Sequence, residues 1–468
     1  MNSITEYVTN KYNWFIHKSG IHKKDYQLFG VQWCVKREMS QLYKGGFIAD
    51  EMGLGKTIMM IATFIVNFMP CTLIVLPNVL LEQWQSEIFR TTGHHVLIYH
   101  GKNKKNITIQ QLQSATIVLT TYNTIAVKSP KKNKEYHPIL TLLHKVTWDR
   151  VVFDEAHHLR NKNSRYFGAK LLNTNIRWLI SGTPIQNKST DFFNLCNVLG
   201  LPASYYANDT NMDHLVRNFV LKRSKKQVGI SIPSINFDNE NVSWKNDDER
   251  KMSNDIHSAI MKPSLSPKLY LFLKARQICI LPALLKNNID RLKQNNVIHS
   301  NHSAALTSSS KMDAVIKTIL ANQNNGNGKL VFCHFKQEID IIVSRLRDNG
   351  MTNVTTFDGR TSQINRSRRL KENYEVIVLQ IQTGCEGLNL QDKFSEIYFV
   401  SPHWNPAIEE QAVARCHRIG QLKHVHVFRF SMDDFLTIDH SPSQYTLDNY
   451  ISRVQVNKRD ISKHILHG

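Results

Sequence analysis

Residues 46–57 read Gly-Phe-Ile-Ala-Asp-Glu-Met-Gly-Leu-Gly-Lys-Thr, and this stretch decides how the rest of the chain is interpreted. Its apolar beginning predicts a short buried strand, and the apolar residues that follow Thr57 predict a helix. Gly53 and Gly55 let backbone N–H groups approach phosphate oxygens closely, and a helix N-terminus favours negative charge. In a loop of this kind, Lys56 is expected to hold the outer phosphates of a nucleotide and Thr57 a Mg²⁺ ion.

The loop departs from the general phosphate-binding pattern at one position. That pattern has a glycine five residues before Gly55, where this chain has Asp50. A Gly-Lys-Thr triplet also occurs in solvated turns that precede helices, so the loop alone leaves two interpretations open. The candidate nucleotide-binding residues of the loop are Asp50, Gly53, Leu54, Gly55, Lys56 and Thr57.

A pair of acidic residues follows a later apolar run. Residues 151–153 are Val-Val-Phe, and they end in Asp154, Glu155, Ala156 and His157. A carboxylate at the end of a buried strand is costly unless it binds something. Asp154 is placed to hold Mg²⁺, and Glu155 to orient and deprotonate a water that attacks the γ-phosphate. The alternative is an acid pair in the first turn of a helix, but the phosphate loop and the pair together favour ATP hydrolysis.

The pattern of apolar runs predicts an α/β fold with two lobes, each a parallel sheet flanked by helices, and helical insertions between them. In the first lobe, strands are expected at 46–49, 72–76, 116–120, 150–153 and 177–181, with helices from 57 and over 80–89. In the second lobe, strands are expected at 329–332, 354–357, 376–379, 396–400 and 424–430. Between the lobes the strand signal fades, and helices are expected at 248–261 and 267–280. The predicted domains are 1–200, 201–307 for the insertions and connection, and 308–468.

Composition indicates the class of binding partner and the cellular environment. The chain has 468 residues and a formal net charge of +21, which favours nucleic acid as a partner first and an anionic membrane surface second. The seven cysteines are odd in number and widely spaced, so we expect a reducing compartment and no structural metal. Residues 58–77 are apolar but contain Asn67 and Pro70. They predict a buried helix, a turn and a strand rather than a membrane span, so the protein is expected to be soluble.

Taken together, these motifs resemble those of superfamily-two helicases and, more narrowly, of the Swi/Snf family of DNA-dependent ATPases. The longest and most specific matches are residues 50–57, 181–187 and 411–421. Further matching segments, in the family's order, are 25–33, 73–84, 120–122, 154–157, 221–226, 276–279, 310–312, 331–335, 358–359 and 384–390. The resemblance covers roughly residues 20–440, and the part after Thr437 matches poorly. It makes Asp50 the family's usual residue and implies that both lobes are RecA-like.

The resemblance implies roles for residues outside the loop and the acid pair. Gln27 is similar to a residue that reads the adenine edge, and the alternative is an ordinary surface glutamine. Ser181 and Thr183 are similar to a segment that links the phosphate state to lobe movement, and the alternative is a strand that ends in a turn. In the second lobe, the corresponding coupling residues are Gly384 and Gly387.

Arg415 and Arg418 are similar to arginine fingers that reach across the cleft to the γ-phosphate. They are three residues apart on an expected helix and therefore share a face, with Gln411 as a nucleotide-binding neighbour at the same face spacing. Such a finger contributes about 10³–10⁵ in rate in related nucleotide hydrolases. The alternative is a solvated basic helix face.

The implied partner is double-stranded DNA, held by its phosphate backbone. The candidate contacts are Lys222, Arg223, Lys225 and Asn389, with Lys102, Lys104, Lys105, Lys226, Arg366, Arg368 and Arg369 as further basic candidates. Each charged run alone is more often a solvated face. Few aromatic residues alternate with these cations, which favours backbone contacts and a steep dependence of DNA affinity on salt.

The expected mechanism is a conformational cycle in which ATP bridges the lobes through Lys56 and Arg418, and hydrolysis opens the cleft. Each cycle moves the protein along double-stranded DNA without strand separation and displaces DNA-bound proteins or nucleosomes. The compact length resembles that of stand-alone Swi/Snf-like ATPases of large DNA viruses, such as the baculovirus global transactivators, and implies a nuclear location, in the host nucleus for a viral protein. Two alternatives remain: an RNA helicase of the same superfamily and a catalytically inert scaffold that binds nucleic acid.

Overall fold

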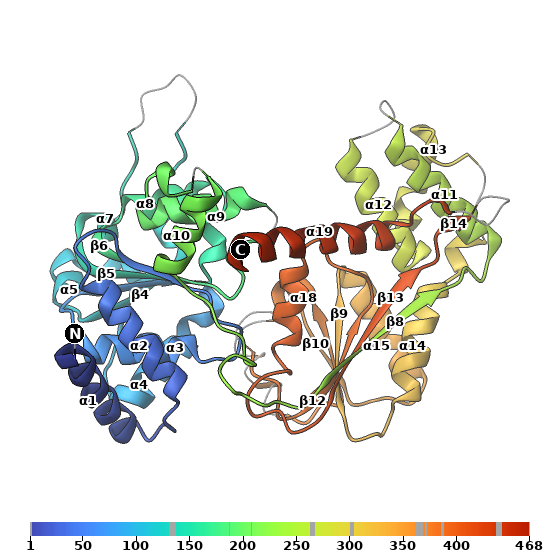
Figure 1. The fold of residues 1–468 in the computed structure, drawn as a ribbon. Coiled ribbons are helices and arrows are strands. Elements are labelled where there is room, and N and C mark those ends of the chain that lie inside the picture. Colours follow the sequence, from blue (N-terminus) through green and yellow to red (C-terminus); the bar gives the residue numbers. More distant parts are fainter. Residues whose placement is uncertain are drawn as a thin grey trace. The chain divides into compact units, whose positions relative to one another are not determined.

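The computed structural model describes residues 2–130, 137–186, 188–206, 208–262, 267–299, 304–361, 365, 368–369, 372–384, 388–436 and 442–467. The chain forms two compact units, which we describe separately (Figure 1). Unit 1 comprises Met1–Ser231 with Asp460–Gly468, and unit 2 comprises Ile232–Arg459.

Unit 1 is built on a 7-stranded sheet with the order β3-β4-β2-β5-β6-β1-β7. All of its strand pairs are parallel. The strands are β1 (Lys44–Ile48), β2 (Thr72–Leu76), β3 (Leu97–Ile98), β4 (Ile117–Thr121), β5 (Thr147–Asp154), β6 (Asn173–Ile180) and β7 (Val220–Leu221). Ile180 of β6 is in register with both Ile48 of β1 and Asp154 of β5, so these three strands end at the same level of the sheet.

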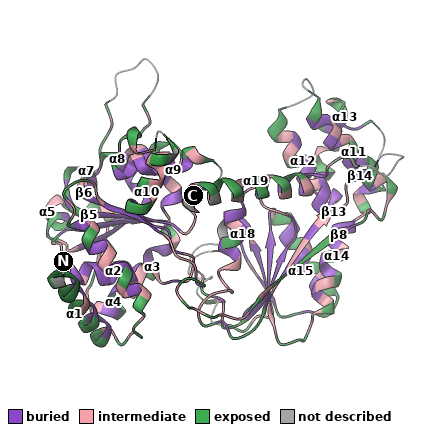
Figure 2. Cartoon of the chain, in the orientation of Figure 1, coloured by how far each residue is buried: buried purple, intermediate pink, exposed green. Residues whose placement is uncertain are grey.

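Helices cover both faces of this sheet. They are α1 (Asn2–Ser19), α2 (Asp25–Glu38), α3 (Lys56–Val66), α4 (Leu81–Thr92), α5 (Ile109–Ser114), α6 (Tyr122–Ile125), α7 (Leu142–Lys145), α8 (Ser164–Leu171), α9 (Ser189–Leu199) and α10 (Asp209–Phe219). Successive side chains of a strand point to opposite faces, and accordingly Phe47 and Ile48 of β1 belong to two different core clusters. The cluster around Ile48 includes α1 to α4, and the cluster around Phe47 includes α5 to α10. A sheet buried on both faces explains the continuous apolar runs of its strands (Figure 2).

Unit 2 contains a 6-stranded sheet with the order β10-β11-β9-β12-β13-β8, again with parallel pairs. Its strands are β8 (Ile235–Val242), β9 (Gly328–Cys333), β10 (Val354–Phe357), β11 (Val376–Gln380), β12 (Phe394–Phe399) and β13 (Val425–Met432). Its helices are α11 (Asp247–Met261), α12 (Lys268–Ile280), α13 (Ile289–Gln294), α14 (Ser310–Ala321), α15 (Lys336–Asp348), α17 (Ile381–Gly384) and α18 (Pro406–Val413), and α19 (Leu447–His467) begins in this unit. A small antiparallel ribbon pairs β14 (Phe435–Leu436) with β15 (Pro442–Gln444).

The prediction of two α/β lobes with parallel sheets is confirmed, and every strand expected from the sequence is present within a few residues. The middle segment, residues 201–307, is divided between the two units. Residues 201–231 belong to unit 1, whereas residues 232–307 belong to unit 2 and supply the unpredicted edge strand β8. Six of the eight β8 residues are exposed, so its sequence, Ile-Asn-Phe-Asp-Asn-Glu-Asn-Val, carries little apolar signal.

Residues 58–77 form the end of α3, a turn and β2, as predicted, and no helix among the described residues is long and apolar enough to cross a membrane. The six cysteines within the described residues are buried free thiols, and Cys385 lies outside that part of the chain. No group of three or more His, Cys, Asp or Glu side chains suited to a metal ion occurs where the structure is described.

Candidate active site

The phosphate loop connects the end of β1 to the start of α3. Gly53 and Gly55 have φ angles of 91° and 75°, in the left-handed region that glycine adopts without steric cost. Gly55 is the N-cap residue of α3, so the N–H groups of the first helical turn, at Lys56 and Thr57, follow directly. A Cβ atom at Gly55 would also lie 2.5 Å from Nε2 of Gln27, so both conformation and space require glycine here. The loop therefore has the geometry that anion binding at a helix N-terminus needs.

Lys56 lies over the backbone of this loop. Its Nζ donates to the carbonyl of Asp50 at 2.9 Å and lies 3.5 Å from the carbonyl of Glu51. The segment after β6 approaches the same ammonium group, since a Cβ at Gly182 would lie 3.5 Å from Lys56 Nζ. Ser181 continues the pairing of β6 with β1 by donating its N–H to Ile48. The structure thus brings the Ser181 segment and the phosphate loop together.

The acid pair lies at the end of β5, two strands from β1. Asp154 accepts hydrogen bonds from Nε1 of Trp84 at 2.7 Å and from the N–H of Glu155 at 3.0 Å. Glu155 has a φ of 51°, which is uncommon for a non-glycine residue and turns the chain sharply after the strand. Its Oε2 lies 3.2 Å from Nδ1 of His157, and that ring nitrogen lies 3.4 Å from Oγ of Ser181. A polar chain therefore links the acid pair to the end of β6.

Burial and the neighbouring charge of Glu155 raise the pKa of Asp154 to about 6. The hydrogen bond from Trp84 and the charge of Lys56 act in the opposite direction. Lys56 is thus close enough to Asp154 for their charges to interact. A buried carboxylate with this raised pKa is a functional-site candidate, because a bound cation would relieve the cost of its burial.

If the chain hydrolyses ATP as the sequence predicts, we expect its apparent Mg²⁺ affinity to weaken as the pH falls through about 6, by roughly tenfold per pH unit below it, because Mg²⁺ then competes with a proton on Asp154. Mg²⁺ titrations of ATP hydrolysis at several pH values measure this. Trp84→Phe removes a hydrogen bond that lowers the Asp154 pKa, so it should move the transition to higher pH. A Mg²⁺ requirement that is constant from pH 5 to 8 would contradict the assignment.

Three aromatic and imidazole side chains support the acid pair and were not among the predicted site residues. Trp84 of α4 binds the Asp154 carboxylate, Tyr122 donates its hydroxyl to the Asp154 carbonyl at 2.6 Å, and His157 contacts Glu155. Their sequence signal was present, because each lies in a segment that resembles a helicase motif. The motifs alone do not reveal that these side chains contact the acid pair, because the contacts depend on how separate strands pair.

Gln27 of α2 lies against the phosphate loop. Its Nε2 donates to the carbonyl of Leu54 at 3.1 Å, and the residue is 2% exposed, so the alternative of a surface glutamine is wrong. Its Oε1 is buried and has no hydrogen-bond partner within the described residues. A buried acceptor of this kind is costly unless a ligand supplies a donor.

Arg223 and Lys225 were predicted to contact DNA, but the structure pairs them with the acids of the phosphate loop. Arg223 forms an ion pair with Asp50, and Lys225 forms one with Glu51. The side chains of Arg223 and Lys225 are 13% and 7% exposed, so neither presents its charge freely to a DNA backbone. Lys222, their neighbour, is half-buried, and Lys226 is exposed.

In unit 2, the prediction that Arg415 and Arg418 lie on one helix face is wrong, because α18 ends at Val413. The carbonyl of Arg415 accepts from the N–H of Leu390, and that of Cys416 accepts from the Gln421 side chain. Arg415 and Arg418 therefore lie in a turn and a bend after the helix.

The two arginines are nevertheless close to each other. Burial and the charge of Arg415 lower the pKa of Arg418, and Arg418 donates to the side-chain oxygen of Asn389. Gln411 is 1% exposed, and its Nε2 has no hydrogen-bond partner among the described residues. Gly384 is the last residue of α17, while Gly387 lies outside the described residues. Unit 2 thus gathers Arg415, Arg418 and Asn389 into one polar group.

The other basic candidates differ in exposure. Lys102 and Lys105 are exposed around the short 3-10 turn Asn103–Asn106, and Arg369 binds the carbonyl of Thr356 at 2.8 Å. Arg366 and Asn187 lie outside the described residues.

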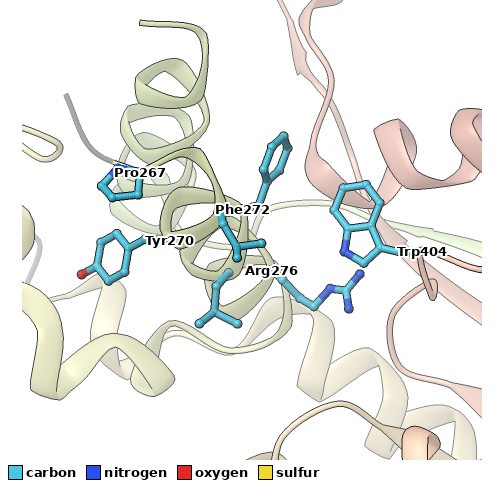
Figure 3. A pocket seen from close by; sticks show the side chains of 7 residues that line it. Pro267, Tyr270, Phe272, Arg276 and Trp404 are labelled. Carbon is cyan, nitrogen blue, oxygen red and sulfur yellow. The ribbon is translucent and has the colours of Figure 1, made fainter. Parts of the chain in front are cut away.

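Unit 2 also has an open pocket of about 780 Å³ along α12 (Figure 3), lined by Pro267, Leu269, Tyr270, Phe272, Leu273, Arg276 and Trp404. Its lining is almost wholly apolar, which makes it unsuited to a triphosphate.

Comparison with known proteins gives consistent matches along the chain. Residues 26–279 match the SNF2-related domain, and residues 310–420 match the helicase conserved C-terminal domain. The chain is 27% identical to the probable global transactivator of Orgyia pseudotsugata multicapsid polyhedrosis virus, over 94% of this chain and 93% of that protein. A SWI2/SNF2 ATPase core of Sulfolobus solfataricus, solved in complex with double-stranded DNA, aligns with 95% of this chain and 97% of that one, at 22% identity and a TM-score of 0.41.

Two cellular relatives are longer than this chain. An ATP-dependent DNA helicase of Arabidopsis thaliana is 27% identical over 88% of this chain and 59% of its own length. The ATPase of the ISWI chromatin-remodeling complex of Saccharomyces cerevisiae is 27% identical over 94% of this chain and 42% of its own length. The chain therefore spans about half the length of these two relatives.

Proposed function

The chain belongs to the SNF2-related family, and we propose from this premise that it is a DNA-dependent ATPase that translocates on double-stranded DNA and remodels protein–DNA complexes without separating the strands. The observation that carries the proposal is the meeting of Lys56, Asp154 and Ser181 at one end of the unit 1 sheet, where β1, β5 and β6 are in register. A phosphate loop and an acid pair with a buried aspartate, both at the carboxyl ends of these strands, suit a Mg²⁺–nucleotide.

The residues present fit ATP and Mg²⁺ chemically. Mg²⁺ takes oxygen ligands, and the Asp154 carboxylate and Thr57 hydroxyl are oxygen donors of unit 1. The orphaned Oε1 of Gln27 matches a donor such as the amino group of adenine. The loop N–H groups after Gly55 and the ammonium of Lys56 suit phosphate oxygens.

Each residue then has a defined task. Bound Mg²⁺ neutralises phosphate charge in phosphoryl transfer. Asp154 stays ionised above its pKa and holds the cation, while Glu155 orients a water and takes its proton. His157, in contact with Glu155 and Ser181, fixes the orientation of the Glu155 carboxylate. Ser181 and Thr183, with Gly384 and Gly387, couple the phosphate state to movement, and Arg415 and Arg418 stabilise charge on the γ-phosphate.

The proposed partner is the phosphate backbone of double-stranded DNA. A net charge of +21 supports a polyanion, and the relatives include an ATP-dependent DNA helicase and the ATPase of a chromatin-remodeling complex. Lys222 and Asn389 remain the proposed contacts of the predicted set, together with the exposed cations Lys102, Lys105 and Lys226. DNA-bound proteins or nucleosomes are the proposed substrates of remodeling. We place this activity in the nucleus, and in the host nucleus for a viral protein.

Measuring ATP hydrolysis by the full chain with and without linear duplex DNA tests this function. We expect stimulation of at least about tenfold by duplex DNA, falling steeply between 50 and 200 mM salt because phosphate contacts release counterions. A duplex with a single-stranded tail should not be unwound under the same conditions.

Parallel reactions separate the alternatives. Stimulation by RNA in place of duplex DNA would support an RNA helicase, and unwinding of the tailed duplex would contradict translocation without strand separation. Phosphate release that neither nucleic acid stimulates and that persists in Glu155→Gln would leave only a scaffold that binds nucleic acid.

A further inference from the structure

The phosphate loop starts with two carboxylates, which is unfavourable beside an anion. Asp50 is 1% exposed, and Glu51 follows it in the same loop, ahead of Lys56. A like charge close to a phosphate weakens its binding, and a buried carboxylate also needs a partner to offset its lost hydration. The loop therefore needs compensating positive charge from elsewhere in the chain.

Arg223 supplies that charge to Asp50 in a two-point contact. Nε of Arg223 donates to Oδ1 of Asp50 at 3.0 Å, and Nη2 donates to Oδ2 at 2.5 Å. The planar guanidinium matches a carboxylate in this geometry, which lysine cannot reproduce. The Asp50 carboxylate is thus both neutralised and fixed in orientation.

The same guanidinium holds the helix that carries Gln27. Nη1 of Arg223 donates to the carbonyl of Tyr26, the residue before Gln27, and the rings of Tyr26 and Phe29 lie 5.7 and 5.8 Å from the guanidinium carbon. Gly30 of α2 packs closely against Arg223 and Met59, since a Cβ atom at Gly30 would lie 2.1 Å from Sδ of Met59 and 3.0 Å from Nη2 of Arg223. Arg223 therefore connects the N-terminal part of α2 to the phosphate loop.

Lys225 makes the corresponding contact with Glu51. Its Nζ lies 2.9 Å from Oε1 of Glu51, and its backbone N–H donates to Oε2 at 2.8 Å. The backbones also pair, because Ala49 donates to the carbonyl of Leu221 at 2.8 Å and Glu51 donates to that of Arg223 at 2.9 Å. The parallel pairing of β1 with β7 thus continues past both strands and runs along the beginning of the phosphate loop.

We propose that Arg223 and Lys225 are positioning residues of the nucleotide site: they hold Asp50 and Glu51 away from the phosphates and set the loop against Gln27. This inference rests on the proposed function, since it assigns these cations to nucleotide binding rather than to DNA. Lys56 already donates to the Asp50 carbonyl, so a carboxylate released from Arg223 would compete with the phosphates for the Lys56 ammonium.

The test measures Mg²⁺–ADP binding to the full chain by calorimetry without DNA, and binding of a labelled DNA duplex by fluorescence anisotropy without nucleotide. Arg223→Gln should weaken Mg²⁺–ADP binding by roughly 10- to 100-fold, the range for losing hydrogen bonds between charged groups. Its DNA affinity should change less than about threefold. Arg217→Gln, the same substitution at an exposed arginine of α10, should leave Mg²⁺–ADP binding unchanged.

A second change tests the mechanism. Asp50→Asn added to Arg223→Gln removes the uncompensated carboxylate and should restore at least part of the Mg²⁺–ADP affinity, whereas there would be no rescue if Arg223 acted only through the Tyr26 carbonyl. Lys225→Met keeps the buried packing and should weaken Mg²⁺–ADP binding by several-fold with the thermal midpoint little changed. It serves as the deciding variant if Arg223→Gln does not fold.

The outcomes distinguish the two proposals. Normal Mg²⁺–ADP binding with weakened DNA binding in both Arg223→Gln and Lys225→Met would overturn this inference and return the two residues to the DNA interface. Absence of Mg²⁺–ADP binding by the unchanged protein would instead overturn the proposed ATPase function, and this inference with it.

Discussion

Glu155→Gln will lower the rate of ATP hydrolysis by about 10²–10⁴ while leaving Mg²⁺–nucleotide binding within a few-fold of the unchanged protein. The substitution keeps the shape of the side chain but removes the base that takes a proton from the attacking water. Glu155 stands in a left-handed turn directly after the buried β5, beside a metal-ligating candidate and in contact with His157. Steady-state phosphate release with saturating duplex DNA, and Mg²⁺–ADP calorimetry, measure the two effects separately.

The matched control is Glu82→Gln, which changes an exposed carboxylate in the first turn of α4 of the same unit. It should leave both hydrolysis and nucleotide binding unaltered. A Glu155→Gln protein that hydrolyses ATP within tenfold of the unchanged rate would remove Glu155 from the mechanism. Loss of nucleotide binding in that variant would instead show that Glu155 holds the Mg²⁺–nucleotide rather than the water.

Removing the proposed arginine finger will have an effect of similar or larger size. Arg418→Ala or Arg415→Ala should lower kcat by about 10³–10⁵ for the residue that acts on the γ-phosphate, with a much smaller change in Mg²⁺–ADP affinity. The physical reason is that a finger stabilises charge on the γ-phosphate in the transition state, and ADP lacks that phosphate. Single-turnover hydrolysis, with the protein in excess over ATP, measures the rate of the chemical step and excludes product release as the limiting step.

Arg347→Ala is the control for these variants, because Arg347 is an exposed arginine of α15 in the same unit. Arg418 donates to Asn389, so Asn389→Ala should give a smaller loss than Arg418→Ala by allowing the guanidinium to move. If the arginine variants lose Mg²⁺–ADP affinity and kcat by equal factors, the arginines contribute to ground-state binding rather than to transition-state stabilisation. Unchanged hydrolysis in both single variants would contradict the finger assignment.

The fold was largely predictable because its strands are buried on both faces. Continuous apolar runs such as residues 72–76 identify a parallel sheet by local sequence alone, and the loop at 50–57 fixes which end of the sheet carries chemistry. Edge strands lack this signal. β8 has mostly exposed side chains, and β7 has two residues, so only their pairing with distant strands defines them.

The placement of the candidate residues was predictable where it depends on local sequence alone, as at Gly55, Lys56 and the acid pair. The placement was not predictable where a charged side chain pairs with a residue that is distant in the sequence. The basic run at 222–226 looked like a DNA contact, because Asp50 and Glu51 are more than one hundred and seventy residues earlier. The turn geometry at Arg415 likewise depends on a bond from Leu390, which helix periodicity cannot register.

The buried carboxylate of Asp154 also has a consequence for folding. Its pKa is raised from 3.8 to about 6, so the folded chain binds this proton more tightly than the unfolded chain does. The carboxyl group therefore favours folding below its ordinary pKa and loses that contribution as the pH rises through about 6. The ionised group therefore lowers the free energy of unfolding near neutrality. The folded protein is thus less stable at this site when Asp154 is ionised, and a cation bound to the carboxylate would restore part of that stability.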